Sequence, residues 1–435
     1  MARIIPFRGL RYNQEKIANL SSVVTPPYDI IDETAQARYY AESPVNIIRL
    51  ELGFTFPQDT IENNRYTRAA KYLEKWLQDE ILIPEPKPSF YVYRQEFLNR
   101  GKKLIRTGLI CGLAVEPYEK GTVLPHEETL SKPKADRLQL MRATQSNFSS
   151  IFGLYVDEKR TVDSLINDFV NDAPPVINIT DENNEVHKIW VVDDDEIIGQ
   201  VISLLSPTKI FIADGHHRYE TALEYAREMK EAKQEGFDYV MATLVNLYDE
   251  GLVVLPTHRL VSNLPNFDSD TFKEKLEALF VLETADNKND LKDYINQLEN
   301  RRKNGHVFGM YLDGTLYFLT LKNLESIKQQ LPQGRSDAWK ELDVAILDNI
   351  ILDGLLGIGT EQRANQENLA YSRSEEWVVK QVDSRQFQIG FFLNSTRVEE
   401  IVDVAESRDK MPQKSTYFYP KLITGLIINN LKINP

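Results

Sequence analysis

The sequence predicts a mixed α/β fold, and three observations lead to this prediction. The chain has 435 residues, which is long enough for two or three domains. It is 42% hydrophobic and contains 20 Tyr, 19 Phe and 4 Trp, a composition typical of a globular protein with a large core and not of a disordered or fibrous one. Segments with apolar residues at three- and four-residue spacing alternate with short apolar runs, which indicates that helices alternate with strands.

The N-terminal segment is expected to contain two helices. A short extended segment at residues 4–7 precedes a loop in which two consecutive prolines, at positions 26 and 27, hold the backbone extended. Asp32 is suited to be the N-cap of a helix that ends near residue 40. A longer helix follows Asn63, because apolar residues recur there at helical spacing, and the prolines at residues 84–88 end it.

Strands and helices alternate in the middle of the chain. Residues 90–97 and 103–115 look like paired strands around the turn Asn99-Arg100-Gly101, and residues 121–130 read as a polar loop. Further strands are predicted at residues 151–156, 185–192, 209–213, 238–246 and 252–256, and further helices at residues 134–144, 161–170, 197–205 and 216–232.

The character of the chain changes after residue 264. Residues 265–330 are predicted to be a small α+β insertion, with helices at 269–280 and 290–303 and a hairpin of strands 307–312 and 315–320 around Asp313-Gly314. This divides the chain into an N-terminal α/β region (1–264), the insertion, and a C-terminal α/β region (331–435) that packs back on the core. The last region is expected to contain helices at 344–355 and 396–406 and strands at 386–393 and 425–430.

Charge and composition exclude several classes of function. The 65 acidic residues outnumber the 51 basic ones, so indiscriminate nucleic-acid binding is not expected, although a local basic pocket for a small anion is allowed. Cys111 is the single cysteine and sits in an apolar strand, so it reads as a core residue, and no intrachain disulfide can form. No apolar run reaches the roughly 18 residues of a membrane span, and the N-terminus lacks the apolar stretch of a signal peptide. We therefore expect a cytoplasmic protein without a membrane partner.

The clearest local signal is residues 211–219, where an apolar strand is followed by a polar turn and then a helix. Gly215 permits a tight turn, the first amides of the helix attract an anion, and Arg218 can add bidentate hydrogen bonds to a phosphate. Asp214 could cap the helix, bind Mg²⁺ or accept a hydroxyl proton. In the alternative interpretation Asp214 is only a cap, and His216 and His217 are surface residues. Adjacent histidines point about 100° apart on a helix, which disfavours a zinc site built on these two alone.

The second signal is residues 124–137. It combines His126 with the carboxylates of Glu127 and Glu128, and three cations follow closely; they are Lys132, Lys134 and Arg137. Such a mixture can support acid–base chemistry on a phosphorylated ligand. Alternatively, these charged residues are the solvent-exposed first turns of a helix and carry no chemistry.

The third signal is residues 410–421, in which Lys414, Ser415 and Thr416 precede a run of aromatic residues. The glycine spacing of a Walker motif is missing, so a P-loop is not supported. Residues Thr257-His258-Arg259 could add one more base and one more cation after a strand, whereas His187 and His306 look like ordinary positions.

Taken together, these segments resemble the family catalogued as domain of unknown function 1015 (DUF1015), whose name states no activity. The resemblance rests on residues 6–12, 26–29, 124–147, 151–155, 212–221 and 411–421. More distantly, the turn at Asp214 is similar to the phosphate-binding turn of the ParB/sulfiredoxin-like superfamily, which includes an ADP-dependent free serine kinase. This resemblance implies a ParB/sulfiredoxin-like core, nucleotide phosphates held by Gly215, His216, His217 and Arg218, and Glu127 or Glu128 as general base.

These signals favour an enzyme, a nucleotide-dependent phosphotransferase that uses ATP or ADP and acts on a small hydroxylated, serine-like metabolite. Arg218, Lys132, Lys134, Arg137 and the loop of Lys414, Ser415 and Thr416 would supply positive charge and hydrogen bonds, and Asp214 could carry Mg²⁺. One alternative is a non-catalytic regulator that binds a nucleotide or a phosphometabolite. Another is a metal-assisted phosphatase or hydrolase that uses His126, Glu127, Asp214 and the two adjacent histidines. The three loops are expected to meet in one cleft, with Arg218 and Lys414 within about 10 Å of each other. The donor, the acceptor and the oligomeric state stay open.

Overall fold

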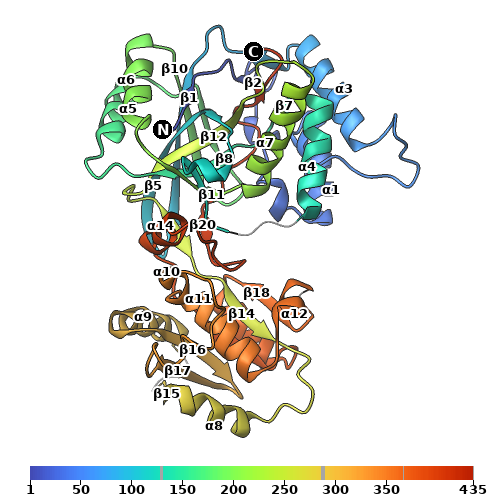
Figure 1. The fold of residues 1–435 in the computed structure, drawn as a ribbon. Helices are drawn as coiled ribbons and strands as arrows, with labels where there is room; N and C mark the ends of the chain where they lie inside the picture. Colours follow the sequence, from blue (N-terminus) through green and yellow to red (C-terminus); the bar gives the residue numbers. More distant parts are fainter. Residues whose placement is uncertain (128–130, 286–289, 366, 435) are drawn as a thin grey trace. The chain divides into compact units, whose positions relative to one another are not determined.

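The computed structural model describes residues 1–127, 131–285, 290–365 and 367–434 (Figure 1). The predicted mixed α/β class is confirmed, because helices and strands alternate along the chain. The chain forms two compact units. Unit 1 comprises Met1–Pro125, Thr129–Val253 and Pro420–Pro435, and unit 2 comprises His126–Glu128 and Val254–Tyr419.

The described part of unit 1 is built on a nine-stranded mixed sheet in the order β6-β11-β8-β12-β5-β4-β10-β9, with β1 paired to β5. The long antiparallel pair β4–β5 turns at Arg100 and Gly101, which both have positive φ, as the predicted hairpin requires. The strands are β1 (Ile4–Ile5), β4 (Phe90–Asn99), β5 (Lys102–Ala114), β6 (Val123–Pro125), β8 (Ile151–Tyr155), β9 (Ile177–Thr180), β10 (Val186–Val192), β11 (Ile210–Asp214) and β12 (Tyr239–Asn246).

Helices of unit 1 pack on this sheet and on one another. Alternate residues of β5, among them the predicted core residue Cys111, share one apolar core with side chains of α5, α6 and α7, and α4 packs against α7 and α3. Asp32 caps α1 as predicted, because its Oδ1 accepts the N–H of Ala35 at 2.7 Å. The helices are α1 (Glu33–Glu42), α2 (Ile48–Glu51), α3 (Arg65–Gln78), α4 (Ser131–Thr144), α5 (Thr161–Asp172), α6 (Asp195–Leu205) and α7 (His216–Glu231), with the short turns η1 (Leu20–Ser22), η2 (Tyr28–Ile30) and η3 (Tyr118–Lys120).

Two small strand pairs complete unit 1. One joins β2 (Leu10–Tyr12) to β3 (Leu82–Pro84), and the other joins β7 (Ser146–Asn147) to β21 (Asn429–Asn430). The second pair returns the last residues of the chain to unit 1. Within the strand predicted at 425–430, Asn429 and Asn430 pair with β7, and Ile428 forms an isolated antiparallel bridge with Leu10.

Unit 2 contains a six-stranded sheet in the order β15-β17-β16-β19-β14-β18 within the described residues. Segment 265–330 supplies β15, β17 and β16, and these share the sheet with β14, β18 and β19 from outside that segment. The observed division therefore differs from the boundaries expected at 264 and 330, because backbone pairing joins the expected insertion to its flanks. The strands are β14 (His258–Val261), β15 (Phe280–Thr284), β16 (Val307–Leu312), β17 (Thr315–Leu321), β18 (Leu369–Ser372) and β19 (Ile389–Phe392), and β13 (Val253–Leu255) pairs with β20 (Tyr417–Tyr419).

The helices of unit 2 include an unusual π-helical stretch. The helix predicted at 344–355 is split between α11 and η5, and η5 has π-helical hydrogen bonding throughout. The helices are α8 (Ser269–Leu279), α9 (Leu291–Arg301), η4 (Arg302–Asn304), α10 (Asp337–Lys340), α11 (Asp343–Ile346), η5 (Leu347–Leu355), α12 (Thr360–Asn365), α13 (Glu375–Asp383) and α14 (Val398–Glu406). None of the described helices of either unit combines the length and apolar character that a membrane span requires.

Candidate functional site

The turn between β11 and α7 has the sharp geometry that its sequence predicts. Gly215 has φ 89° and ψ 28°, a left-handed conformation that favours glycine. A Cβ atom at this position would lie 2.9 Å from Nε and Nη2 of Arg218, so the Arg218 guanidinium is packed directly over the turn.

The Asp214 carboxylate holds two cations in place. Its Oδ1 accepts from Lys421 Nζ and its Oδ2 from Arg218 Nη2, both at 2.9 Å, while Arg218 Nη1 donates to the carbonyl of Ser150 at 2.5 Å. Burial alone would raise the pKa of Asp214, but the charges of Lys421 and Arg218 hold it well below its usual range. Asp214 therefore stays ionised at neutral pH and is a weak proton acceptor.

The two adjacent histidines occupy different environments. His216 is buried, whereas His217 is partly exposed. Burial lowers the pKa of His217, and the charge of Lys134 lowers it further, so its neutral form is favoured. Lys134 itself forms an ion pair with Glu220.

Arg137, from α4, is held by a second carboxylate network. Its Nε donates to Asp136 Oδ2 at 2.7 Å, and its Nη1 donates to the carbonyl oxygen of Glu51 at 3.0 Å and lies 3.3 Å from Glu51 Oε1. The same Glu51 oxygen accepts from the Ser149 hydroxyl at 2.9 Å. The Arg137 guanidinium lies 4.0 Å from the ring centre of Tyr28, in the proline-rich loop.

Arg137 and Arg218 line the same cavity in unit 1. Its volume of about 40 Å³ exceeds the space that one water molecule occupies. Two guanidinium groups beside hydroxyl and amide groups are suited to hold a small oxyanion. The remaining lining residues are Glu51, Leu140, Met141, Ser146, Asn147, Phe148, Ser149, Thr221 and Val240.

Tyr28, Glu51, Ser149 and Lys421 were not singled out by the sequence as site residues. Burial raises the pKa of Tyr28 to about 12, and the charges of both Arg137 and Arg218 act on it in the opposite direction. Tyr28 and Lys421 lay inside segments that the sequence had marked. Ser149 carried no signal, because its role depends on its contact with the distant Glu51.

The second and third sequence signals meet in unit 2. The carbonyl of His126 accepts the N–H of Met411 at 2.6 Å, and His126 Nε2 lies 2.9 Å from Thr416 Oγ1. Glu127 Oε1 accepts the N–H of Lys414 at 3.0 Å. Ser415 is buried and donates to the carbonyl of Pro412 at 2.5 Å. Glu128 and the side chain of Lys132 lie outside the described residues.

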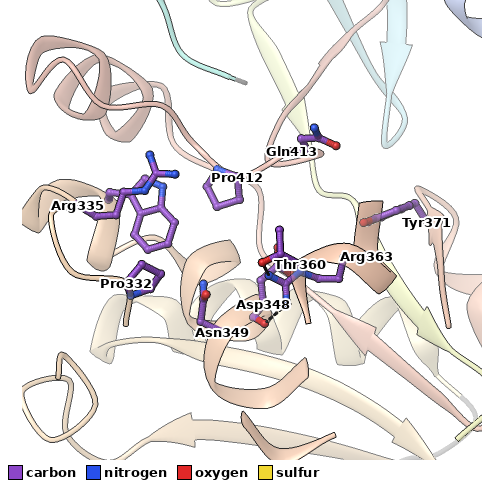
Figure 2. A pocket seen from close by; sticks show the side chains of 10 residues that line it. Pro332, Arg335, Asp348, Asn349, Thr360, Arg363, Tyr371, Pro412 and Gln413 are labelled. Carbon is purple, nitrogen blue, oxygen red and sulfur yellow. Dashed lines mark hydrogen bonds between the residues drawn. The ribbon is translucent and has the colours of Figure 1, made fainter. Parts of the chain in front are cut away.

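Another cavity lies in unit 2, next to the segment of residues 410–421 (Figure 2). The cavity has a volume of about 170 Å³. Arg363, one of its lining residues, donates hydrogen bonds to the carbonyl oxygens of Asp348 and Ile358, both at 2.8 Å. Burial raises the pKa of Tyr371 on its wall, the charge of Asp348 raises it further, and the charges of Arg259 and Arg363 act in the opposite direction. The lining residues are Pro332, Arg335, Trp339, Asp348, Asn349, Thr360, Arg363, Tyr371, Pro412 and Gln413.

Residues Thr257-His258-Arg259 do not form a loop. His258 and Arg259 lie inside β14 and are fully buried, so they are part of the sheet of unit 2. Pairing with β18 and β19 makes His258 and Arg259 part of a second strand that follows β13.

Comparison with solved structures finds only distant similarity. A conserved hypothetical protein from Pyrococcus furiosus is 11% identical, with a TM-score of 0.35, over 75% of this chain and 97% of that one. A free serine kinase in complex with AMP is 12% identical, with a TM-score of 0.35, over 73% and 92%. A C-terminally truncated SbnI from Staphylococcus aureus is 9% identical, with a TM-score of 0.35, over 75% and 90%.

A search of the curated proteins found no match. The model of a protein family, described as a protein of unknown function (DUF1015), matches residues 4–345, and the chain therefore belongs to the DUF1015 family.

Proposed function

We propose that unit 1 binds the phosphates of a nucleotide, ATP or ADP, and that the protein transfers a phosphoryl group from it to a small hydroxylated, serine-like metabolite. One observation carries the proposal: Arg137 and Arg218, which lie on different helices, line one cavity together with the hydroxyl-bearing Ser149 and Thr221. Guanidinium groups in such a cavity suit the oxygens of a phosphate, with which they form bidentate hydrogen bonds.

The surroundings of Arg218 support this role. Within the described residues its Nη1 donates to the carbonyl of Ser150 and its Nη2 to Asp214, and a guanidinium carries five N–H donors, so donors remain for a ligand. Asp214 and Gly215 would act as positioning residues that fix Arg218 over the first turn of α7. The amides of His216 and His217, and Lys134 nearby, would add to the attraction for an anion.

Phosphoryl transfer depends mainly on positioning and positive charge. In the proposed reaction the acceptor hydroxyl attacks the terminal phosphorus atom, the bond to the leaving nucleotide oxygen breaks, and the hydroxyl proton moves to a carboxylate. Glu127 or Glu128 is proposed as this base, with His126, Ser415 and Thr416 shaping the loop around it.

Both oxygens of Asp214 accept from cations, so a further positive charge is disfavoured at that carboxylate. The arrangement of Asp214 therefore does not fit Mg²⁺, and no step is derived through it. Mg²⁺ that accompanies a nucleotide would be carried by the phosphate oxygens.

A ligand screen followed by a transfer assay tests the proposal. We expect ATP or ADP to raise the melting temperature, since binding to the folded state stabilises it, and ³¹P NMR to detect a new phosphate monoester when a hydroxylated amino acid is added. Arg218→Ala should weaken nucleotide binding at least tenfold, whereas Arg227→Ala on the exposed side of the same helix should not change it.

The alternatives predict different results in the same experiment. Tight nucleotide binding without any product, over an incubation of hours, would favour the regulator. Release of inorganic phosphate without an acceptor, and its loss with a chelator, would favour the phosphatase. Unchanged nucleotide binding and turnover in Arg218→Ala would contradict the proposal itself.

A further inference from the structure

We propose that Asp181, Glu185 and His187 of unit 1 bind a zinc-type divalent metal ion in the hairpin between β9 and β10. One ligand-type atom from each of the three side chains lies within 4.8 Å of the others. None of these residues belongs to the phosphate-binding cavity, so this metal site stands independently of the proposed phosphotransfer.

The hairpin explains why three residues of different types come together. Asp181 directly follows β9, Glu185 directly precedes β10, and His187 is the second residue of β10. Asp181 Oδ1 accepts the backbone N–H groups of Asn183 and Glu185, both at 2.9 Å, which fixes the side chain. The other oxygen, Oδ2, then lies 3.4 Å from His187 Nε2.

His187 is the observation that points to a ligand. Its side chain is 0% exposed, and its Nε2 is buried, lies 3.4 Å from Asp181 Oδ2 and makes no hydrogen bond with the described residues. A buried polar nitrogen whose contact with a carboxylate is this long is poorly satisfied, and a metal ion bound between the two atoms would satisfy both. The other ring nitrogen, Nδ1, lies 2.7 Å from the hydroxyl oxygen of Tyr93. Metal-ligating histidines usually make such a bond with their second nitrogen, which orients the ring.

The distance between the Asp181 and His187 ligand atoms fits zinc. Two ligands that each lie 2.0–2.1 Å from a tetrahedral zinc ion are about 3.3 Å apart. The separation of 3.4 Å between Asp181 Oδ2 and His187 Nε2 matches this value. Two carboxylates and one neutral imidazole also balance the charge of a divalent ion. His187 and Glu185 are buried, so the ion would lie inside the hairpin that carries the edge strand β9, and the fourth position of a tetrahedral zinc ion would be left to a water molecule.

Zinc titration of the metal-free full-length protein tests the proposal. After dialysis against a chelator, Zn²⁺ is added in competition with a chromophoric chelator, and the bound metal is also measured by mass spectrometry. We expect one equivalent to bind, the melting temperature to rise with Zn²⁺, and X-ray absorption to find nitrogen and oxygen ligands at about 2.0–2.1 Å.

Variants locate the ion. Three variants each remove one ligand and preserve another property of the side chain. Asp181→Asn keeps the acceptor for the two backbone N–H groups, Glu185→Gln keeps the side-chain volume, and His187→Phe keeps a ring. Each variant should lower zinc affinity at least tenfold. His306→Phe, which removes a histidine paired with Asp343, should bind zinc like the wild type. His217→Ala should also bind like the wild type, which excludes the adjacent histidines of α7 as the site.

Two results would overturn the inference. One is a metal content at background level together with no effect of Zn²⁺ on the melting temperature. The other is wild-type zinc affinity in both Asp181→Asn and Glu185→Gln, which would place the ion elsewhere. Circular dichroism shows whether each variant is folded, and the absorption spectrum of the wild type decides the ligand set even if a variant fails to fold.

Discussion

At the scale of single residues, Gly215 controls where the Arg218 guanidinium lies. Gly215→Ala should place a methyl group 2.9 Å from that guanidinium and displace it from Asp214. The left-handed backbone adds a strain of about 1–2 kcal/mol. We expect nucleotide affinity, measured by calorimetry, to fall at least tenfold.

Gly101→Ala is the matched control for this prediction. Gly101 also has a positive φ, of 80°, but nothing lies within 4 Å of its added Cβ. It should lose similar stability and keep full nucleotide affinity. Equal affinities in the two variants would mean that the turn does not position Arg218 for a ligand.

The low pKa of Asp214 predicts how stability depends on pH. Its folded pKa lies below the unfolded value of about 3.9, so the unfolded state takes up the proton first as the pH falls. The stabilisation is therefore complete above about pH 4 and is lost as the pH falls further towards the folded pKa. Urea denaturation between pH 7 and pH 3 should show a steeper acid loss in the wild type than in Asp214→Asn.

Asp193→Asn, a change at an exposed carboxylate, serves as the control and should retain the steep acid loss. An acid dependence of Asp214→Asn that matches the wild type would show that the ion pairs of Asp214 with Lys421 and Arg218 add no stability.

Some of these residues could be found in the sequence and others could not. The geometry of Gly215 and the cap at Asp32 follow from chemistry within a few residues of the chain. The bond of Lys421 to Asp214 joins residues 207 positions apart, and it forms because Gln95 and Arg106 anchor the carbonyls of Lys421 and Pro420. No local pattern contains that information.

At the scale of elements, β14 and η5 meet through a buried ion pair. Arg259 is 1% exposed, its Nε lies 3.7 Å from Asp348 Oδ1, and its Nε and Nη2 form no hydrogen bond with any residue that the structure describes. Asp348→Ala would leave the guanidinium buried without a counter-charge. We expect a loss of about 3 kcal/mol in the free energy of unfolding, measured by denaturant titration.

A double variant and a surface control test this interpretation. Arg259→Met combined with Asp348→Leu should recover much of the loss, because the desolvated charges are both gone. Glu283→Gln, which breaks the exposed pair with Arg301, should cost less than about 1 kcal/mol. If the double variant lost as much free energy of unfolding as the two single variants together, this would argue against a direct ion pair between Arg259 and Asp348.

The elements that the sequence predicts well are those with a complete local signal. Helix α3 has an apolar stripe that includes Leu73 and Trp76, and the hairpin β16–β17 has Asp313-Gly314 at its turn, where both residues have positive φ. Strands β6, β9, β14, β15 and β18 and helix α13 were missed. These strands have only three to five residues, and pairing with distant partners, not periodicity, decides their conformation.

At the scale of the whole molecule, the chain crosses between its two units more than once. His126 and Glu127 belong to unit 2 although the residues on both sides of that segment belong to unit 1, and the last residues return to unit 1. The approach of Arg218 to Lys414 within about 10 Å stays a prediction, because these residues belong to different units. Sequence patterns divide a chain into consecutive segments. They therefore did not predict that residues 126–128 belong to unit 2 and that residues 420–435 return to unit 1.

In the proposed function Arg137 and Arg218 act together on one bound phosphate. A double-mutant cycle of ADP binding, measured by titration calorimetry, tests it most directly. Each of Arg137→Lys and Arg218→Lys keeps its charge but loses the bidentate geometry, so each should weaken binding about tenfold, which is about 1.4 kcal/mol. The fold-loss of ADP affinity in the double variant should be smaller than the product of the fold-losses in the two single variants, because both side chains contact the same ligand group. Fully additive losses, or wild-type affinity in either single variant, would contradict the account.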